Sequence, residues 1–464
     1  MERRKGNSIS ENLAQFVTGI TYDELPPDVV QKAKVCILDL FGAHYAGYDI
    51  ESCKPVRDYI SGLDTSSQAT VWSLGTRTLT TEAAFSNSAV THSTIFDDMH
   101  TQSVSHFGSI VIPSAIAVAE HKGCSGKELI LAIVCGYEVG VGIGTALMTQ
   151  EFLQSGFRPS GTFGAFGSSA AAGKLLGLNA DQMTRAFGFA ANFAVGLTAF
   201  GQEGTDDMIY HNGLASRNGV LSCMLAERGA TSPRNIFEVD NGFCNTYHGN
   251  VEALEEIVRG LGDRYKIEEV YFKSVPACAF VQSTARAALE IALHRDDFVV
   301  GDIKKVEVRI FHQGKYYPGC DCAGPFESIM QAQMSNQFTV ATILVHKGVS
   351  FENYRGYRDP PVQDLARKVK VIEDKEATSK FPDEQLAKVE VFLKDGSNRT
   401  AISRNPRCLD GSEVVEKSKA YLGRILSGET CNQVIDIVQR LETLKTVNAL
   451  TRLLQKDKWL ISPR

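Results

Sequence analysis

The sequence predicts a mostly helical protein, with a large all-helical domain and a smaller α+β domain. Residues 8–265 contain long apolar stretches at helical spacing, rich in Ala and Gly. Residues 303–311 and 387–393 instead alternate apolar and polar side chains, as half-buried strands do. From residue 412 the spacing is helical again. We therefore predict a helical domain over 1–268, an α+β domain over 269–405, and a helical segment over 406–464 that returns to the first domain.

The helical domain is expected to begin with two helices within residues 8–47. Ser10 is placed to start the first helix, and the Pro-Pro-Asp sequence from residue 26 is typical of the start of the second. Residues 66–74 mix polar and apolar side chains, and an extended conformation stays open for them. A further helix from about Thr81 leads into a polar loop.

A long apolar helix is predicted over residues 127–148. Its glycines at 136, 140 and 144 recur every four residues, so they share one face and allow a neighbouring helix to approach closely. Two glutamates interrupt the apolar run, which favours tight helix packing over a membrane span. Further helices are predicted over 162–177, 181–197 and 212–228.

In the α+β domain, the strand at 387–393 ends in Lys-Asp-Gly, which is a hairpin turn signal. Residues 399–403 are therefore expected to form its return strand. Helices are predicted over 282–294 and 332–347.

Composition excludes several classes of protein. The chain of 464 residues has a net charge of −6, which gives no basis for binding nucleic acid. No apolar run reaches the roughly 20 residues of a membrane span, and the N-terminus lacks the apolar segment of a signal peptide. The 11 cysteines include no CxxC pair and fit a reducing compartment. We expect a cytoplasmic protein; the close pair Cys320 and Cys322 leaves a metal or redox role open.

The stretch from Thr91 to Glu120 concentrates titratable groups. Asp97, Asp98, His100 and His106 lie within ten residues and precede a helix of small apolar residues. A polar loop against a buried helix is typical of an active site. The alternative is structural, with acids that bind backbone amides and histidines that are satisfied in the core.

Three long motifs carry a family resemblance. They are THSTIFDDMH…HFGSIVIPSAIAVAE within 91–120, GFRPSGTFGAFGSSAAAGKLLGL at 156–178 and HNGLASRNGVLSCMLAERGATSP at 211–233. In this order they resemble the MmgE/PrpD family, which includes 2-methylcitrate dehydratases, cis-aconitate decarboxylases and iminodisuccinate epimerases. The resemblance implies the MmgE/PrpD fold, in which the α+β domain is a lid over the helical domain, the site lies in the cleft between them, and the protein is a homodimer.

The resemblance also implies that this chain has lost charged groups of the family's pocket. An acid, a threonine, a lysine and a tyrosine of the family align with Ile95, Met99, Met208 and Phe338, and the proline after the conserved histidine is Phe107. Apolar side chains each contribute about 1.5–3 kcal/mol when buried against an apolar ligand. The pocket is therefore expected to prefer a hydrophobic substrate with few charges.

Polar groups also remain in the expected pocket. The family histidine of the first motif is kept as His106, that of the second motif is Arg158, and a lid histidine aligns with Gln282. Arg158 precedes a predicted helix start, which suits one carboxylate or carbonyl oxygen. Alternatively, it pairs with Asp97 or Asp98 as structure.

We assign candidate roles accordingly. The candidate catalytic residues are His106, Arg158, Asp97 and His100. The candidate substrate-binding residues are Ile95, Met99, Phe107, Thr162, Met208, Tyr210, Gln282 and Phe338. No metal or organic cofactor is expected, since Asp206 and Asp207 lack partners at metal-ligand spacing.

Three hypotheses follow. The favoured one is a cofactor-independent cyclase or isomerase of secondary metabolism, in which an apolar pocket folds a hydrophobic carbonyl-bearing substrate, as for an intramolecular Diels–Alder reaction. The second is a dehydratase or decarboxylase of an alkylated citrate- or aconitate-like acid, with His106 and Arg158 on the carboxylates and Asp97 or His100 as the base. The third is a ligand-binding protein without catalysis.

Overall fold

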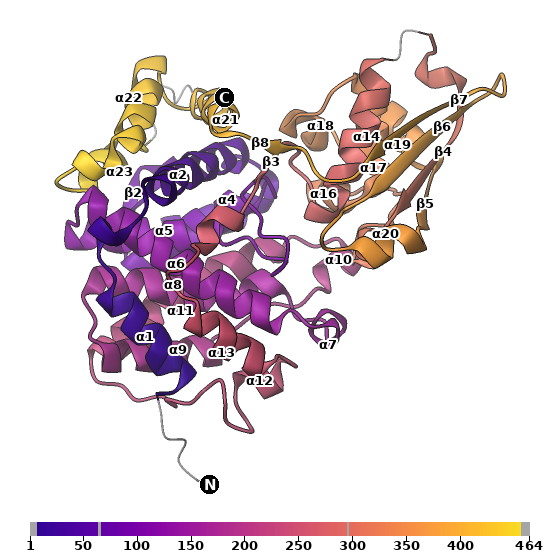
Figure 1. Cartoon of the computed structure of the whole chain (residues 1–464). Coiled ribbons are helices and arrows are strands. Elements are labelled where there is room, and N and C mark those ends of the chain that lie inside the picture. The colour runs from indigo at the N-terminus through magenta and orange to yellow at the C-terminus, as the bar shows by residue number, and fades with distance from the viewer. Residues whose placement is uncertain (1–6, 64–65, 295–296, 456–464) are drawn as a thin grey trace.

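The structure is a computed structural model that describes residues 7–63, 66–294 and 297–455. It has a large helical part and a smaller part built on a four-stranded sheet (Figure 1). The predicted fold class, a large all-helical domain plus a smaller α+β domain, is confirmed.

Long helices form the centre of the helical part. They are α2 (Pro27–Gly47), α4 (Thr80–His92), α5 (Gly108–Lys122), α6 (Gly126–Leu147), α8 (Pro159–Leu176), α9 (Ala180–Asn192) and α11 (Met208–Glu227). Around them lie α1 (Ile9–Gly19), α3 (Lys54–Ser61), β1 (Ala69–Val71), β2 (Thr76–Thr78), α7 (Gln150–Gln154), α10 (Phe200–Glu203), α12 (Phe243–Thr246) and α13 (Val251–Arg259).

The close crossing of α6 and α8 depends on glycine, as the four-residue spacing predicted. A Cβ atom on Gly136 would lie 2.9 Å from the carbonyl oxygen of Gly167, and one on Gly140 would lie 2.6 Å from the ring of Phe107. Helix α6 is long and apolar enough to cross a membrane, but 94% of that stretch is buried inside the protein. It is a core helix.

The sheet of the α+β part has the strand order β5-β4-β6-β7. Its strands are β4 (Ile303–Ile310), β5 (Val369–Glu373), β6 (Ala387–Leu393) and β7 (Asn398–Ser403), with β4 and β5 parallel and the other pairs antiparallel. Helices α14 (Gln282–Leu293) and α17 (Asn336–His346) pack on one face (Figure 1). The remaining helices here are α15 (His312–Tyr316), α16 (Ile329–Met334), α18 (Phe351–Arg355), α19 (Pro360–Ala366) and α20 (Lys375–Lys380).

Several element boundaries differ from the predictions. The first helix starts at Ile9, because Ser8 rather than Ser10 accepts the capping hydrogen bond. The helix predicted over 332–347 is broken at Ser335, whose hydroxyl accepts from the amide of Phe338 and starts a new helix. Helix α9 ends five residues early, at Asn192, and strand β5 was not predicted.

Two antiparallel strands connect the parts. They are β3 (Phe272–Lys273) and β8 (Cys408–Leu409), close to the predicted boundaries at 268 and 405. After β8 the chain forms α21 (Gly411–Leu422), α22 (Gly428–Gln439) and α23 (Asn448–Leu453), and α21 packs on α2. The C-terminal segment therefore packs against the helical part.

A buried ion pair fastens this returning segment. The Lys417 ammonium lies 2.9 Å from an Asp39 carboxylate oxygen and 2.5 Å from the carbonyl oxygen of Phe96. Both charged side chains are at most 4% exposed.

We expect Lys417→Met to lower the free energy of unfolding by about 3–5 kcal/mol, because it leaves the buried Asp39 without its partner. The double variant Asp39→Leu/Lys417→Met removes both charges and should recover most of that loss. Urea unfolding followed by circular dichroism measures both. Equal stability of the single and double variants would contradict the role assigned to the pair.

Candidate active site

A small cavity lies where the helical part meets the α+β part, with a volume of about 30 Å³. The helical part contributes His92, Ile95, Met99, Val104, His106, Arg158, Pro159, Ser160, Phe200 and Met208. The α+β part contributes Cys278, Ala279, Phe280, Tyr317 and Met334. In the helical part, the wall of the cavity is therefore formed mainly by the end of α4, the loop that follows it, and the first residues of α8 and α11.

The loop between α4 and α5 has an unusual backbone. Ile95 and Val104 both line the cavity and both have positive φ angles, of 48° and 49°. Such values are rare for β-branched residues and persist where surrounding contacts enforce them. Here the Lys273 ammonium donates to the carbonyl oxygen of Ile95 over 2.8 Å, and Met99 exchanges two backbone hydrogen bonds with Tyr271.

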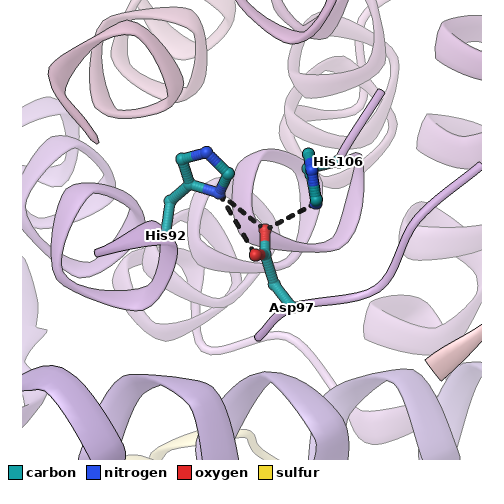
Figure 2. A group of neighbouring side chains, drawn as sticks. All are labelled: His92, Asp97 and His106. Atoms are coloured by element: carbon teal, nitrogen blue, oxygen red, sulfur yellow. Dashed lines mark hydrogen bonds and ion pairs between the residues drawn. The ribbon is translucent and has the colours of Figure 1, made fainter. Parts of the chain in front are cut away.

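Asp97 is the centre of the polar network. Its carboxylate lies 2.9 Å from Nδ1 of His92 and 3.5 Å from Nδ1 of His106 (Figure 2). Burial alone would raise the pKa of Asp97, but the hydrogen bond from His92 and the positive charge of Lys273 hold it below its usual range. Asp97 is therefore ionised, although it is 1% exposed.

The two histidines are neutral bases with defined tautomers. His92 donates from Nδ1 to Asp97, and its Nε2 lies 2.6 Å from an Arg158 nitrogen, so this lone pair accepts from the guanidinium. His106 donates from Nδ1 to the carbonyl oxygen of Asp98 over 2.8 Å, which leaves Nε2 with a lone pair. Burial lowers the pKa of both rings, with Arg158 adding to this for His92 and Lys273 for His106.

Arg158 is a buried cation held by neutral groups. Its guanidinium donates to Asn212 and to the carbonyl oxygen of Met208, besides His92. Among the described residues, it forms no ion pair within 4 Å, so the alternative of a structural pair with Asp97 or Asp98 is wrong. Burial lowers its pKa to about 10, and it stays charged at neutral pH.

Lys273 adds a second buried cation. It is fully buried and its ammonium donates to the carbonyl oxygens of Ile95 and Ala277. Burial lowers its pKa to about 8, partly offset by Asp97. Asp97 is the carboxylate that acts most strongly on both cations, with Asp207 adding to its effect on Arg158 and Asp39 to its effect on Lys273.

Tyr317 faces the same cavity from the α+β part. Burial raises the pKa of its phenol, so the hydroxyl stays protonated and can give a proton. The rest of this wall is apolar, with Phe280, Met334 and Phe200 around it.

His92, Asp97 and His106 also offer ligand atoms within 4.8 Å of one another, close enough for one metal ion. However, these atoms already bond to each other and to Asp98, and Arg158 and Lys273 repel a further cation. The arrangement suits proton transfer and anion binding better than metal binding.

The structure brings together only part of the residues that the sequence singled out. His106, Arg158, Ile95, Met99 and Met208 line the cavity, and Asp97 lies directly behind them.

Seven other candidates lie away from the cavity wall. The His100 ring forms hydrogen bonds with Ser103 and Glu269. Asp98 accepts a hydrogen bond from the backbone amide of Gly108 at the start of α5, which is the structural role that the sequence left open for the acids. Phe107 packs against α6, and Phe338 packs between the rings of Phe326 and Tyr354. The Thr162 hydroxyl donates to the carbonyl oxygen of Arg158. Gln282 donates to the carbonyl oxygens of Val275 and Ala277, and Tyr210 borders a separate surface hollow. His100 therefore has no direct contact with a ligand in the cavity.

Asp206 and Asp207 also lie apart. Asp207 is half exposed and pairs with His211 on the next helical turn.

Sequence reasoning missed His92, Lys273 and Tyr317. His92 stands inside the first quoted motif, five residues before Asp97, so its nearness to the acids was an available signal. Lys273 and Tyr317 lie more than 160 residues further along, and nothing local distinguishes them from surface residues.

Comparison with known proteins identifies the family. The MmgE/PrpD N-terminal domain model matches residues 11–254, and the MmgE/PrpD C-terminal domain model matches residues 275–443. The chain belongs to the MmgE/PrpD family. The three motifs therefore led to the correct family.

Curated MmgE/PrpD relatives align over nearly the whole chain. Cis-aconitate decarboxylase of Aspergillus terreus is 26% identical over 471 residues, which cover 97% of this chain and 96% of that protein. Cis-aconitate decarboxylase of Homo sapiens is 27% identical, with 97% and 95% covered. The cis-aconitate decarboxylase-like protein oryM of Aspergillus oryzae is 26% identical, with 98% of each covered.

We expect the rings of His92 and His106 to be neutral at pH 7, because burial and the nearby cations lower both pKa values below the ordinary 6.5. Long-range ¹H–¹⁵N NMR of ¹⁵N-histidine-labelled protein should show the Nδ1–H tautomer for both. Signals are assigned with His92→Gln and His106→Gln. Imidazolium shifts at pH 7 would contradict this network.

Proposed function

We propose that this MmgE/PrpD enzyme is a carbon–carbon or carbon–oxygen lyase that decarboxylates or dehydrates a small carboxylic acid bearing an apolar group. The buried guanidinium of Arg158 carries this proposal. It lines the cavity, and among the described residues it forms no ion pair within 4 Å, so a substrate carboxylate would give it a charged partner. The curated relatives named as cis-aconitate decarboxylases support the lyase class.

The groups around the cavity supply the steps of such a reaction. Arg158, at the cavity wall, binds the carboxylate, with Lys273 adding positive charge from behind Ile95. In a dehydration, His106 Nε2 removes the proton next to the carboxylate, while the Tyr317 hydroxyl protonates the leaving hydroxyl group. In a decarboxylation, Tyr317 protonates the carbon from which carbon dioxide has left. Asp97 orients the two histidines and stabilises the charge that forms on them.

The apolar wall supports a substrate with fewer charges than a tricarboxylic acid. Ile95, Met99, Met208 and Phe200 are all at most 3% exposed and belong to the same apolar cluster as the core of the α+β part. An additional carboxylate against this wall would lose its hydration without a partner. A cavity of about 30 Å³ holds little more than water, so binding requires the lid to move or side chains to rearrange.

A second candidate is the cyclisation or isomerisation of a hydrophobic carbonyl compound, including an intramolecular Diels–Alder reaction. The same apolar wall favours it, and Arg158 or Tyr317 would polarise the carbonyl oxygen. The two buried cations near the cavity favour an anion instead, and we therefore rank this candidate second.

We also propose that the enzyme acts in the cytoplasm as a homodimer. All 11 cysteines are free, which fits a reducing compartment.

An assay by mass spectrometry tests the reaction class. The enzyme is incubated in D₂O with cis-aconitate, 2-methylcitrate and alkylated analogues of both acids. We expect loss of carbon dioxide with uptake of one deuterium, or loss of water, from an alkylated acid. His106→Gln should lower kcat by about 10²–10⁴-fold, and Arg158→Gln should raise KM by roughly 10–100-fold. Tyr210→Phe, away from the cavity, is the matched control. An isomer of unchanged mass without deuterium would favour cyclisation.

Met208→Lys tests the reason for the apolar wall. The variant places a third cation beside Arg158, so kcat/KM should shift towards acids with more carboxylates by about tenfold or more. Met208→Leu keeps the wall apolar and should preserve the order of substrates. An unchanged preference in Met208→Lys would show that this position does not select charge.

A further inference from the structure

Two cysteines meet in the wall of the cavity. The Sγ atoms of Cys278 and Cys320 lie 3.9 Å apart and share a hydrogen bond. Cys278 lines the cavity and Cys320 lies behind it, fully buried. The sequence drew attention to Cys320 and Cys322 as a close pair. In the fold, Cys320 instead contacts Cys278, and Cys322 is partly exposed.

We propose that Cys278 and Cys320 form a redox modification site, at which a peroxide converts the two thiols reversibly to a disulfide. Two thiols and one hydrogen peroxide give one disulfide and two molecules of water. The proposal does not depend on which substrate the enzyme takes, because it rests on the distance between the two sulfur atoms.

The surroundings assign different roles to the two sulfurs. The hydrogen bond from Cys320, together with Lys273 and Arg158, lowers the pKa of Cys278, whereas the same bond and burial raise that of Cys320. The thiolate of Cys278 therefore attacks the peroxide O–O bond, which gives a sulfenic acid and, with a proton, one water. The Cys320 sulfur then attacks the Cys278 sulfur, closes the disulfide and releases the second water.

Access to this pair is through the cavity. A void of about 30 Å³ admits molecules near the size of water, such as hydrogen peroxide, while a bulky oxidant is excluded. Cys278 is therefore exposed to a small oxidant only when the site holds no substrate.

Disulfide formation would change the cavity. A disulfide bond is about 2.0 Å long, so the sulfurs must approach from their present 3.9 Å. The loop around Cys278 continues into Ala279 and Phe280, and Cys320 follows Tyr317 by three residues, with its amide bonded to the Tyr317 carbonyl oxygen. Either loop therefore moves cavity-lining residues as the bond closes.

Peptide mapping by mass spectrometry tests the proposal without relying on activity. The full-length protein is treated with hydrogen peroxide, remaining thiols are blocked, and the protein is digested without reduction. We expect a cross-linked peptide that contains Cys278 and Cys320, lighter than its two parts by two hydrogens and separated again by dithiothreitol. Absence of this peptide, or capture of Cys278 only by Cys322 or another cysteine, would overturn the proposal.

Two variants sharpen the test. Cys320→Ser should abolish the cross-link and leave a sulfenic acid on Cys278 that dimedone labels, and Cys322→Ser, two residues away, should leave the cross-link intact. Should Cys320→Ser fail to fold, the mapping of the unaltered chain still decides. A cross-link that forms equally fast with the cavity filled by a carboxylate inhibitor would contradict access through the cavity.

Discussion

The buried carboxylate of Asp97 is the constraint on which the site depends. An ionised group at 1% exposure must be surrounded by donors and cations, since its desolvation is otherwise too costly. The hydrogen bond from His92 and the positive charge of Lys273 meet this requirement. The contacts of Asp97 with the two histidines fix the orientation of the imidazole rings. Together with the hydrogen bond from Lys273 to Ile95, they hold the end of α4, the following loop and strand β3 against one another. The left-handed backbone at Ile95 is one consequence, because its carbonyl oxygen is held by Lys273.

The cavity combines this charged side with an apolar side. The side chains of Ile95, Met99 and Met208 belong to the apolar cluster that forms the core of the α+β part. The cations at 158 and 273 remain buried near them. The proposed preference for a carboxylic acid with an apolar group depends on two features, the apolar packing across the domain boundary and the two buried cations.

Much of the fold was predictable because it depends on local patterns. The apolar spacing of α2 and α6, the alternation in β4 and β6, and the hairpin after β6 all appear in the sequence before any contact is known. The break at Ser335 and the parallel strand β5 were not predictable in the same way, because a serine cap competes with helix continuation and a parallel neighbour lies far along the chain. Sites such as Phe107 and Phe338 were assigned to the pocket by alignment, although their rings pack into the cores.

By itself, the sequence determined the family, the mostly helical fold class with its smaller α+β part, and a polar loop with Asp97 and His106. Only the tertiary structure decided that His92 and Arg158 bond to each other, that Lys273 and Tyr317 belong to the site, and that His100 does not line it. The physical reason is that protonation and charge balance depend on distance and burial. Those quantities are set when segments more than 60 residues apart, such as those that carry residues 92 and 158, are packed together.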